Sequence, residues 1–594
     1  MMKQLKTLCK NIAWICNPFR KYGKAYLLLS VLILGLYSPI EDIIYVRFPE
    51  IMIDLMAAGK AFSYIAGVAV MLCGASFLSN AIRKLARVYF TKKQAAISLQ
   101  VNQEIYQKAL QIDYHLIDNP EYYDRFAWAV EEYANQVEKG RDFVIQLTQN
   151  LLSLLVLGAI IVSLGPWILL VELVQMGLHM VVDLFVNSNT IQLKEASIPL
   201  ERRLAYFHRL FYLKEYAADM KSTPLGKVAR DSYDDYGNQK IKVLTKYTWR
   251  IELLNVLHEV IFFVAELIIV LYLIKSILSG RIPEIGMYMT LMLSFYRLDS
   301  KIDALTYLFK DASILSMNVE KIRIFFSLQS EIEKEKEESK LVLEDESCSV
   351  ELNNVGFSYE NSDFSLSNLN LTIRAGEKIA IVGENGAGKS TFVKLLLRLY
   401  DVDHGTICLN GRPIQAYDVH QLRSRVGVAF QNTNIYAMSF ADNIALYQPV
   451  TASRLQETVK RLGLDELLEK NCADYHAELT REFYENGIIL SGGEAQKIGL
   501  ARVMCGDFSL LLLDEPSSAL DPLAEYKLSR AILSAANQTT TILVSHRLSN
   551  VRDADRIVVL DHGAIRECGT HDELMKRKGK YYEMFTKQAE NYVR

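Results

Sequence analysis

Long apolar runs dominate the first half of the chain and stop near its middle. A helix needs about 20 apolar residues to cross a hydrocarbon core that is about 30 Å thick, and runs of this kind recur between Tyr26 and Tyr307. We therefore predict a membrane α-helical bundle of six transmembrane helices, at about Ala25–Val46, Phe62–Asn80, Phe143–Leu164, Pro166–Phe185, Leu253–Ile274 and Glu284–Asp303.

The polar segments between these runs differ in length and charge. The stretches Arg83–Arg141 and Lys194–Arg250 are long and rich in Lys and Arg, as is the N-terminus, whereas the turn at Gly165–Trp167 is short and uncharged. Basic loops mark the cytoplasmic side, which predicts a multi-pass protein of the cell membrane with both termini in the cytosol. Ala96–Ile112 and Leu200–Tyr216 show apolar residues at helical spacing, so we expect long cytoplasmic helical extensions; two small soluble insertions are the alternative.

Several ionisable residues lie inside the predicted spans, where each costs roughly 2.5–3.5 kcal/mol at a helix centre. They are Glu41, Asp42, Glu172, Asp183, Glu259, Glu266, Arg297 and Asp299. One interpretation is a polar translocation path for a cationic or amphipathic cargo. The other is ion pairing between helices, or a place near the membrane interface. Glu172 and Glu266 are the first candidates for the path, and the pattern leaves both interpretations open.

From about Val350 the pattern changes to short strands, Gly-rich turns and amphipathic helices. The almost wholly charged run Glu331–Lys340 separates the two halves and is typical of a solvated connector. We predict a transmembrane domain over residues 1–325, a charged linker over 326–347 and a second domain over 348–594.

Composition agrees with a membrane protein and excludes few other classes. The chain has 594 residues, of which 50% are hydrophobic, and its mean hydropathy is slightly positive, so one ordinary soluble domain is excluded. A net charge of −3 gives no support for a nucleic-acid partner. The eight cysteines form no CxxC pair, so neither a zinc site nor a disulfide framework is indicated.

A phosphate-binding loop is the first chemical motif of the second domain. The strand-like run Lys378–Val382 leads into Gly383–Ser390, which fits G-x-x-x-x-G-K-S, and a helical pattern follows. Backbone N–H groups of such a loop surround phosphate oxygens at a helix N-terminus. An ordinary Gly-rich turn is the alternative. The motif predicts an ATP site with Mg²⁺, in which Lys389 reaches the β- and γ-phosphates and Ser390 ligates Mg²⁺. Its nucleotide-binding residues are Gly383, Asn385, Gly386, Gly388, Lys389, Ser390 and Thr391.

A second motif is the apolar strand Leu510–Leu513, which ends in Asp514 and Glu515. Delivering two carboxylates at the end of a buried strand is costly unless they have partners. We expect Asp514 to bind Mg²⁺ through its water shell and Glu515 to polarise the attacking water. A strand end exposed to solvent is the alternative.

The third motif is Leu490–Glu494, read as LSGGE, with Gln496 two residues later. Together with the phosphate loop before it, LLLLDEP after it and a histidine beyond a further strand, it resembles the ATP-binding cassette (ABC) superfamily over about Val350–Arg594. The resemblance implies an α/β P-loop NTPase domain of ABC type. It also implies that the signature residues Ser491, Gly492, Gly493 and Glu494 belong to the nucleotide-binding set, with Ser491 and the glycine amides in contact with phosphate. Glu494 departs from the Gln of many members, which is compatible with function because Ser491 and the glycine amides supply the contacts.

The same resemblance implies roles for five further residues. Tyr359 is similar to the aromatic residue that stacks on adenine. Gln431 is similar to the glutamine that contacts Mg²⁺ and water, and His546 to the histidine that holds the γ-phosphate. Asp521 resembles a dimer-contact residue, and Glu485 an acidic residue that precedes the signature in exporters. The alternatives are a plain strand tyrosine, a surface glutamine and a structural histidine.

In this superfamily the signature of one cassette completes the ATP site of a second cassette, so the resemblance implies a dimer of half-transporters. A homodimer is the simplest expectation, and a heterodimer with a related half is the alternative. Asp118–Asp124 and Lys214–Asp219 with Pro224–Gly226 resemble the segments that couple the two domains of an exporter.

The implied function is ATP-driven export, in which ATP hydrolysis is coupled to transport. A peptide or an amphipathic natural product is the favoured cargo. A lipid flippase, a multidrug exporter and an ATP-gated channel or regulator remain as alternatives. A cassette protein that acts without transport is disfavoured by the six predicted spans.

Overall fold

The computed structural model describes residues 2–164, 166–279, 285–332, 341–343, 347–359, 364–446, 448–516 and 539–593. The chain divides into two compact units. The first, the membrane unit, comprises Met1–Leu110 and Asp124–Ser327. The second, the ATP unit, comprises Leu328–Arg594 together with Gln111–Tyr123. A short segment from the first predicted cytoplasmic loop therefore belongs to the same unit as the C-terminal domain.

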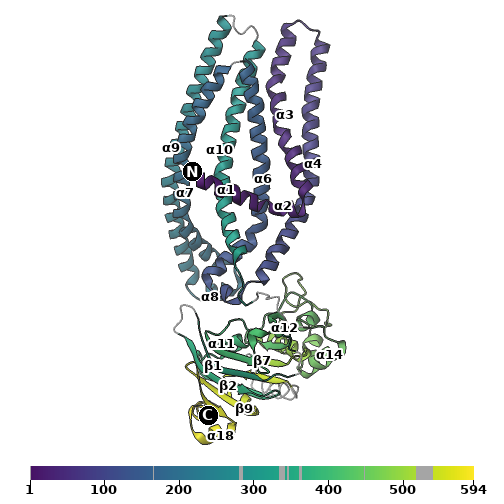
Figure 1. Ribbon diagram of the computed structural model, residues 1–594, viewed down its shortest axis with the longest axis vertical. Helices are drawn as coiled ribbons and strands as arrows, with labels where there is room; N and C mark the ends of the chain where they lie inside the picture. Colours follow the sequence, from purple (N-terminus) through teal and green to yellow (C-terminus); the bar gives the residue numbers. More distant parts are fainter. Residues whose placement is uncertain are drawn as a thin grey trace. The chain divides into compact units, whose positions relative to one another are not determined.

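The membrane unit consists of long helices that run side by side (Figure 1). They are α3 (Lys24–Ala57), α4 (Phe62–Leu110), α6 (Pro120–Leu164), α7 (Pro166–Tyr212), α9 (Leu225–Leu278) and α10 (Ile285–Ser327). Shorter elements are α1 (Met2–Ile15), α2 (Asn17–Tyr22), η1 (Lys214–Tyr216) and α8 (Ala217–Ser222). Helix α7 packs most extensively on α9, and α3 packs on both α4 and α10.

Within the described residues, five helices are long and apolar enough to cross a membrane: Lys24–Ala57, Phe62–Leu110, Arg125–Ser163, Trp167–Tyr212 and Leu225–Leu278. They cover the first five predicted spans except for the end residues Leu164 and Pro166. The described part of the sixth predicted span, from Ile285 onward, lies in α10, which is not one of the five. The first 18 residues of α10 carry Arg297, Asp299 and Lys301, so composition alone does not place this helix in a bilayer.

The two basic loops are helical, as predicted, and the helices continue without a break from the predicted spans. Helix α4 extends to Leu110 and α7 to Tyr212. At 1.5 Å of rise per residue, these extensions are tens of ångströms long. The alternative of two separate soluble insertions is wrong, because each extension belongs to the same helix as its span.

The ionisable residues of the spans fall into two groups. Asp42 is 2% exposed and pairs with Lys301 at 3.2 Å and with Arg297 at 3.8 Å, and Glu266 accepts a hydrogen bond from Tyr296. For Asp42 the interpretation as an ion pair between helices is therefore correct. Glu172 is also buried, but neither of its carboxylate oxygens has a hydrogen-bond partner.

The ATP unit contains two sheets. A four-stranded antiparallel sheet has the order β2-β1-β4-β5, with strands β1 (Val350–Ser358), β2 (Ser365–Ile373), β4 (His404–Leu409) and β5 (Arg412–Pro413). A six-stranded sheet has the order β10-β9-β3-β8-β7-β6. Its strands are β3 (Lys378–Val382), β6 (Val426–Ala429), β7 (Leu510–Asp514), β8 (Thr540–Val544), β9 (Arg556–Asp561) and β10 (Ala564–Gly569).

Short helices surround these sheets. They are α5 (Tyr114–Asp118), α11 (Lys389–Leu396), η2 (Ile414–Ala416), α12 (Val419–Ser424), α13 (Phe440–Ile444), α14 (Ala452–Arg461), α15 (Asp465–Lys470), α16 (Gly492–Cys505), η3 (Leu548–Val551), α18 (His571–Arg577) and α19 (Lys580–Val593).

The six-stranded sheet determines where the chemical motifs meet. Strands β3, β8, β7 and β6 are parallel neighbours, with Ala380 opposite Leu543, Leu543 opposite Leu513, and Leu513 opposite Ala429. The carboxyl ends of four adjacent parallel strands lie at one edge of a sheet, which is where open α/β sheets bind ligands. Each of the four strands leads directly into one predicted motif.

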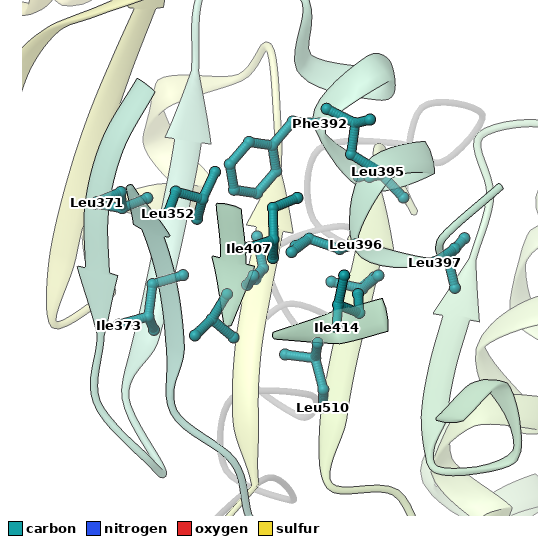
Figure 2. Packing of buried hydrophobic residues seen from close by; sticks show 14 of the residues in the cluster. Leu352, Leu371, Ile373, Phe392, Leu395, Leu396, Leu397, Ile407, Ile414 and Leu510 are labelled. Atoms are coloured by element: carbon teal, nitrogen blue, oxygen red, sulfur yellow. The ribbon is translucent and has the colours of Figure 1, made fainter. Parts of the chain in front are cut away.

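Helix α11 is anchored to this sheet by its apolar face. Phe392, Leu395 and Leu396 are each 1% exposed. Figure 2 shows them packed against side chains of the two sheets, including Leu352 and Leu510. Burial of a Leu or Phe side chain contributes about 1.5–3 kcal/mol. This packing fixes the position of the helix whose first residues are Lys389 and Ser390.

Candidate ATP site

The phosphate-binding loop has the backbone conformation that its glycines permit. Gly386 has φ +80° and Gly388 has φ +104°, both in the left-handed region. A Cβ atom on Gly388 would lie 2.4 Å from Leu366 Cδ2, so no larger residue fits there. Lys389 Nζ donates hydrogen bonds to the carbonyls of Gly383 at 2.9 Å and Glu384 at 3.0 Å. Burial lowers the pKa of Lys389, and the charges of Glu515 and Asp514 oppose that shift.

Ser390 and Asp514 lie together at the end of β7. Burial raises the pKa of Asp514, and a hydrogen bond with the Ser390 side chain opposes this rise. Hydroxyl and carboxylate oxygens are the ligands that Mg²⁺ prefers, usually with retained waters and substrate phosphates. The two side chains therefore fit a Mg²⁺ site of the predicted kind.

Glu515 is the centre of a three-residue cluster. Its Oε2 accepts a hydrogen bond from Gln431 Nε2 at 2.8 Å and lies 3.1 Å from His546 Nδ1. Glu515 also has φ +47°, a conformation that costs about 1–2 kcal/mol for a residue with a Cβ atom and that clusters at functional sites. The structure thus brings together the three predicted catalytic residues, which lie 31 to 115 positions apart in the sequence.

Tyr359 lies beside the phosphate-binding helix. Its hydroxyl is 3.1 Å from Thr391 Oγ1, and its ring contacts the rings of Phe357 and Tyr400 with centroid distances of 5.0 and 5.4 Å. One predicted residue, Asp521, lies outside the described residues.

Most of the predicted site residues line one open cleft of about 1010 Å³, and Asp514 lies behind its lining residues Ser390 and Glu515. The residues that were predicted from the sequence and that line the cleft are Tyr359, Gly383, Asn385, Gly386, Gly388, Lys389, Ser390, Thr391, Gln431, Glu515 and His546. Sequence reasoning missed Phe364, Glu384, Met584, Lys587 and Gln588, which also line it.

The C-terminal helix α19 reaches the cleft at two points. Gln588 donates to the His546 carbonyl at 2.6 Å and accepts from the Leu548 N–H at 2.9 Å. Lys580 forms an ion pair with Glu384 of the phosphate-binding loop at 2.9 Å. Helix α19 is thereby linked both to the loop of His546 and to the phosphate loop. No local motif marks Gln588, so the sequence offered no signal for it.

The signature residues form the N-terminus of α16. Ser491 is the N-cap, and Ser491 and Glu494 make a capping box: Ser491 N donates to Glu494 Oε2 at 2.7 Å and Glu494 N donates to Ser491 Oγ at 3.3 Å. Burial raises the pKa of Glu494, but the hydrogen bonds from Ser491 outweigh it and the pKa is lowered. The amides of Gly492 and Gly493 lie in the first turn, where helix N–H groups lack helical partners and favour anions. Among the described residues, these four do not line the cleft.

The segment Gln111–Tyr123 contacts the cassette beside α11. Asp118 accepts hydrogen bonds from Tyr400 and from Lys394, the latter at 3.3 Å, and the rings of Tyr114 and Tyr400 meet edge to face. Burial raises the pKa of Asp118, but the hydrogen bond from Tyr400 and the charge of Lys394 outweigh it, so the pKa is lowered. Lys394 is on α11, five residues after Lys389.

Comparison with known proteins agrees with this geometry. Residues 366–518 match the family model described as ABC transporter. The chain therefore carries an ABC transporter domain. The subtilin transport ATP-binding protein SpaT of Bacillus subtilis is 28% identical over 551 residues, which cover 92% of this chain and 88% of that protein.

Two further likenesses differ in how much of the chain they cover. The ATP-dependent lipid A-core flippase of Escherichia coli (strain K12) is 36% identical over 259 residues, 43% of this chain and 44% of the flippase. A bacterial Atm1-family ABC exporter with ATP bound has a TM-score of 0.74 at 21% identity, covering 96% of this chain and 98% of that chain. The predicted fold class is confirmed: this chain has the fold of an ABC exporter, with helical membrane region and cassette fused.

Three conclusions follow for this chain. Its cassette binds ATP, its enzymatic activity is ATP hydrolysis coupled to transport, and it is a multi-pass membrane protein.

Proposed function

We propose that this ABC protein is one half of a homodimeric exporter that moves a peptide or amphipathic natural product out of the cytosol, with both termini on the cytoplasmic side. The observation that carries the proposal is the cluster of Gln431, Glu515 and His546 beside the phosphate loop, in a chain with one such cluster and one signature helix among its described residues. ABC exporters of this kind work as dimers, in which the signature of each cassette completes the ATP site of the other.

We assign the roles of the site residues from the family resemblance, and the arrangement of the described ones in the cleft supports the assignment. Mg²⁺, held by Ser390, Gln431 and Asp514, would neutralise charge on the phosphates. Lys389 binds the β- and γ-phosphates, Glu515 orients and polarises the attacking water, and His546 holds the γ-phosphate. Phosphoryl transfer depends mainly on such positioning and charge stabilisation. Tyr359 stacks on adenine, a contact worth about 1–3 kcal/mol. Asp521 supports the contact between the two cassettes.

Two contacts support transmission of ATP binding to the membrane unit. Asp118 bonds to Lys394 on α11 and to Tyr400, whose ring touches Tyr359. A change at the phosphate-binding helix therefore reaches the segment that joins α4 to α6 through Lys394, and a change at Tyr359 reaches it through Tyr400.

The likeness to the subtilin transport protein extends over 92% of this chain, whereas the likeness to the lipid A-core flippase covers only 43%. A likeness over 92% of the chain includes the membrane unit, which binds the cargo, and this favours a peptide over a lipid. A lipid flippase remains the second candidate.

Reconstitution in liposomes tests the proposal. Wild-type protein is expected to hydrolyse ATP faster when amphipathic peptides are added, and to accumulate them on the opposite side only while ATP is hydrolysed. Stimulation by lipids alone would reject the peptide cargo. Flux that continues in Glu515→Gln with ATP bound would indicate a channel, and would reject export. Glu457→Gln, a surface carboxylate paired with Arg461, is the matched control.

A further inference from the structure

A polar cluster lies inside the membrane unit, where helices α7, α9 and α10 meet. It contains His179 and Asp183 on α7, His258 on α9 and Asp303 on α10. One ligand atom from each of His179, His258 and Asp303 lies within 4.8 Å of the other two. The two imidazole rings are 3.7 Å apart at their centroids, and His258 Nε2 is 3.4 Å from Asp183 Oδ1. Residues up to 124 positions apart thus meet in one place.

The burial of His179 without hydrogen-bond partners is a second, independent observation that points to a bound ligand. Its side chain is buried, with 4% exposure, yet neither Nδ1 nor Nε2 has a hydrogen-bond partner. Buried polar atoms are nearly always hydrogen-bonded, and an exception calls for a specific explanation such as an ion. In a neutral imidazole one nitrogen carries the proton and donates, and the other accepts a hydrogen bond or ligates a metal. One nitrogen of His179 belongs to the group of three ligand atoms. A bound cation would give this nitrogen the partner it lacks.

The local charge also favours a cation. Among the described residues, no Lys or Arg forms an ion pair with Asp183 or Asp303, and the nearby Arg297 and Lys301 both pair with Asp42. Two carboxylates in a poorly solvated place are costly without compensation. A divalent ion would balance both, with the histidines neutral as metal ligation requires.

The spacing of polar residues along α7 shows that this cluster is part of a longer polar face of the helix. Glu172, Gln175, His179 and Asp183 follow one another at spacings of three and four residues, which places them on one side of the helix. Gln175 Nε2 donates to Asp299 Oδ1 of α10 at 2.6 Å. Asp299 and Asp303 are likewise one turn apart, so α10 presents a matching acidic face to α7.

We propose that His179, His258 and Asp303, with Asp183 beside His258 as a fourth ligand, form a binding site for a divalent transition metal of the Zn²⁺ class. Two imidazoles with one or two carboxylates suit Zn²⁺, Co²⁺ or Ni²⁺, whereas Mg²⁺ and Ca²⁺ prefer sites made of oxygen. Ligand bonds to Zn²⁺ are about 2.0–2.2 Å long, so binding draws the side chains together from their present spacing. This site is separate from the Mg²⁺ site of the cassette and does not depend on the identity of the cargo.

The position of the proposed metal site along the three helices is consistent with entry of the metal ion from the cytosol. His179, His258 and Asp303 are six, five and zero residues from the ends of the predicted spans Pro166–Phe185, Leu253–Ile274 and Glu284–Asp303. At 1.5 Å per residue, each lies within about 10 Å of its span end. These are the three ends that the loop charges assign to the cytoplasmic side.

Co²⁺ is the probe for the test, because its visible absorption reports the ligands. The full-length chain is purified in detergent with a tag free of histidine, without nucleotide, with metal removed and cysteines alkylated. We expect one Co²⁺ per chain, displaced by equimolar Zn²⁺ but not by a hundredfold excess of Mg²⁺. His258→Gln and Asp303→Asn are each expected to weaken Co²⁺ binding at least tenfold. His208→Gln, on the same helix α7, is expected to bind as wild type does.

A second measurement covers variants that fail to fold. Zn²⁺ should raise the unfolding temperature of the wild-type protein, because a ligand that binds only the folded state stabilises it, and the rise should be absent in His179→Gln. Absence of stoichiometric Co²⁺ from the wild type would overturn the proposal. So would displacement of Co²⁺ by Mg²⁺, or unchanged affinity in the double variant His179→Gln with His258→Gln.

Discussion

The ATP site and the polar interior of the membrane unit differ in how many of their buried polar groups have partners. In the ATP unit, Lys389, Asp514 and Glu515 each have partners supplied by adjacent loops and strands. In the membrane unit, Glu172 and His179 are buried with side-chain atoms that have no hydrogen-bond partner. The first arrangement holds catalytic groups in place. The second leaves binding capacity inside the bundle, as expected of a region that receives a ligand.

The two units also differ in where their apolar side chains lie. Phe392 of the ATP unit is 1% exposed, whereas Phe77 of α4 is 74% exposed, and the apolar stretch of α4 has no buried residue. The cassette is stabilised by a compact core of its own buried side chains. The apolar surface of the membrane unit is available to lipid or to a second copy of the chain.

The largest effect is expected from a substitution in the catalytic cluster of the ATP unit. Glu515→Gln should reduce ATP turnover by about 10²–10⁴-fold, the usual contribution of a general base, while ATP binding survives. Turnover is measured by phosphate release and binding by nucleotide fluorescence titration. Normal turnover in this variant would contradict the role of Glu515; Glu457→Gln should behave as wild type.

The contrast in burial is tested by a pair of matched substitutions. Phe392→Ala should lower the free energy of unfolding of the cassette by about 3–5 kcal/mol, because it removes a fully buried ring. Phe77→Ala should change stability by no more than about 0.5 kcal/mol, as usual for an exposed position. Both are measured by denaturant unfolding in detergent. Similar losses in the two variants would remove the distinction between the units.

A smaller effect is expected at the C-terminal helix. Gln588→Ala removes two hydrogen bonds to the loop of His546, each worth about 0.5–1.5 kcal/mol, so kcat should fall roughly tenfold while the KM for ATP changes less than twofold. Replacement by Glu keeps the acceptor for Leu548 N–H and should restore part of kcat. Steady-state ATPase kinetics measure this split, with the exposed Gln456→Ala as control. A rise in KM alone would show that Gln588 does not act through His546.

The smallest effect concerns the contact between Asp118 and the cassette. Asp118 is about two-fifths exposed on its side chain, so Asp118→Asn should lower stability by only about 0.5–1 kcal/mol. Its pKa is depressed in the folded state, so this contribution is present above the unfolded pKa of about 3.9 and is lost as the pH falls through the lower folded value.

Thermal unfolding at pH 5 and pH 7 should therefore give the same difference between wild type and Asp118→Asn. A difference that shrinks between these two values would contradict the depressed pKa.

The sequence by itself determined most of the ATP site. Each part is a short contiguous segment with its own chemistry, and its parts come together because β3, β6, β7 and β8 end at one edge of a parallel sheet. The sequence also predicted six spans, five of which match helices apolar enough to cross a membrane, and it predicted their helical extensions, because hydropathy and helical spacing are local properties.

Only the tertiary structure decided the remaining features. Gln588 contacts His546 from 42 residues away, and the contact depends on how α19 packs. The segment Gln111–Tyr123 belongs to the ATP unit although it lies between two membrane helices. His179, His258 and Asp303 form a cluster only because α7, α9 and α10 pack together in one register. Contacts between helices that are far apart in the sequence depend on the rotation and register of each helix. Local periodicity predicts neither.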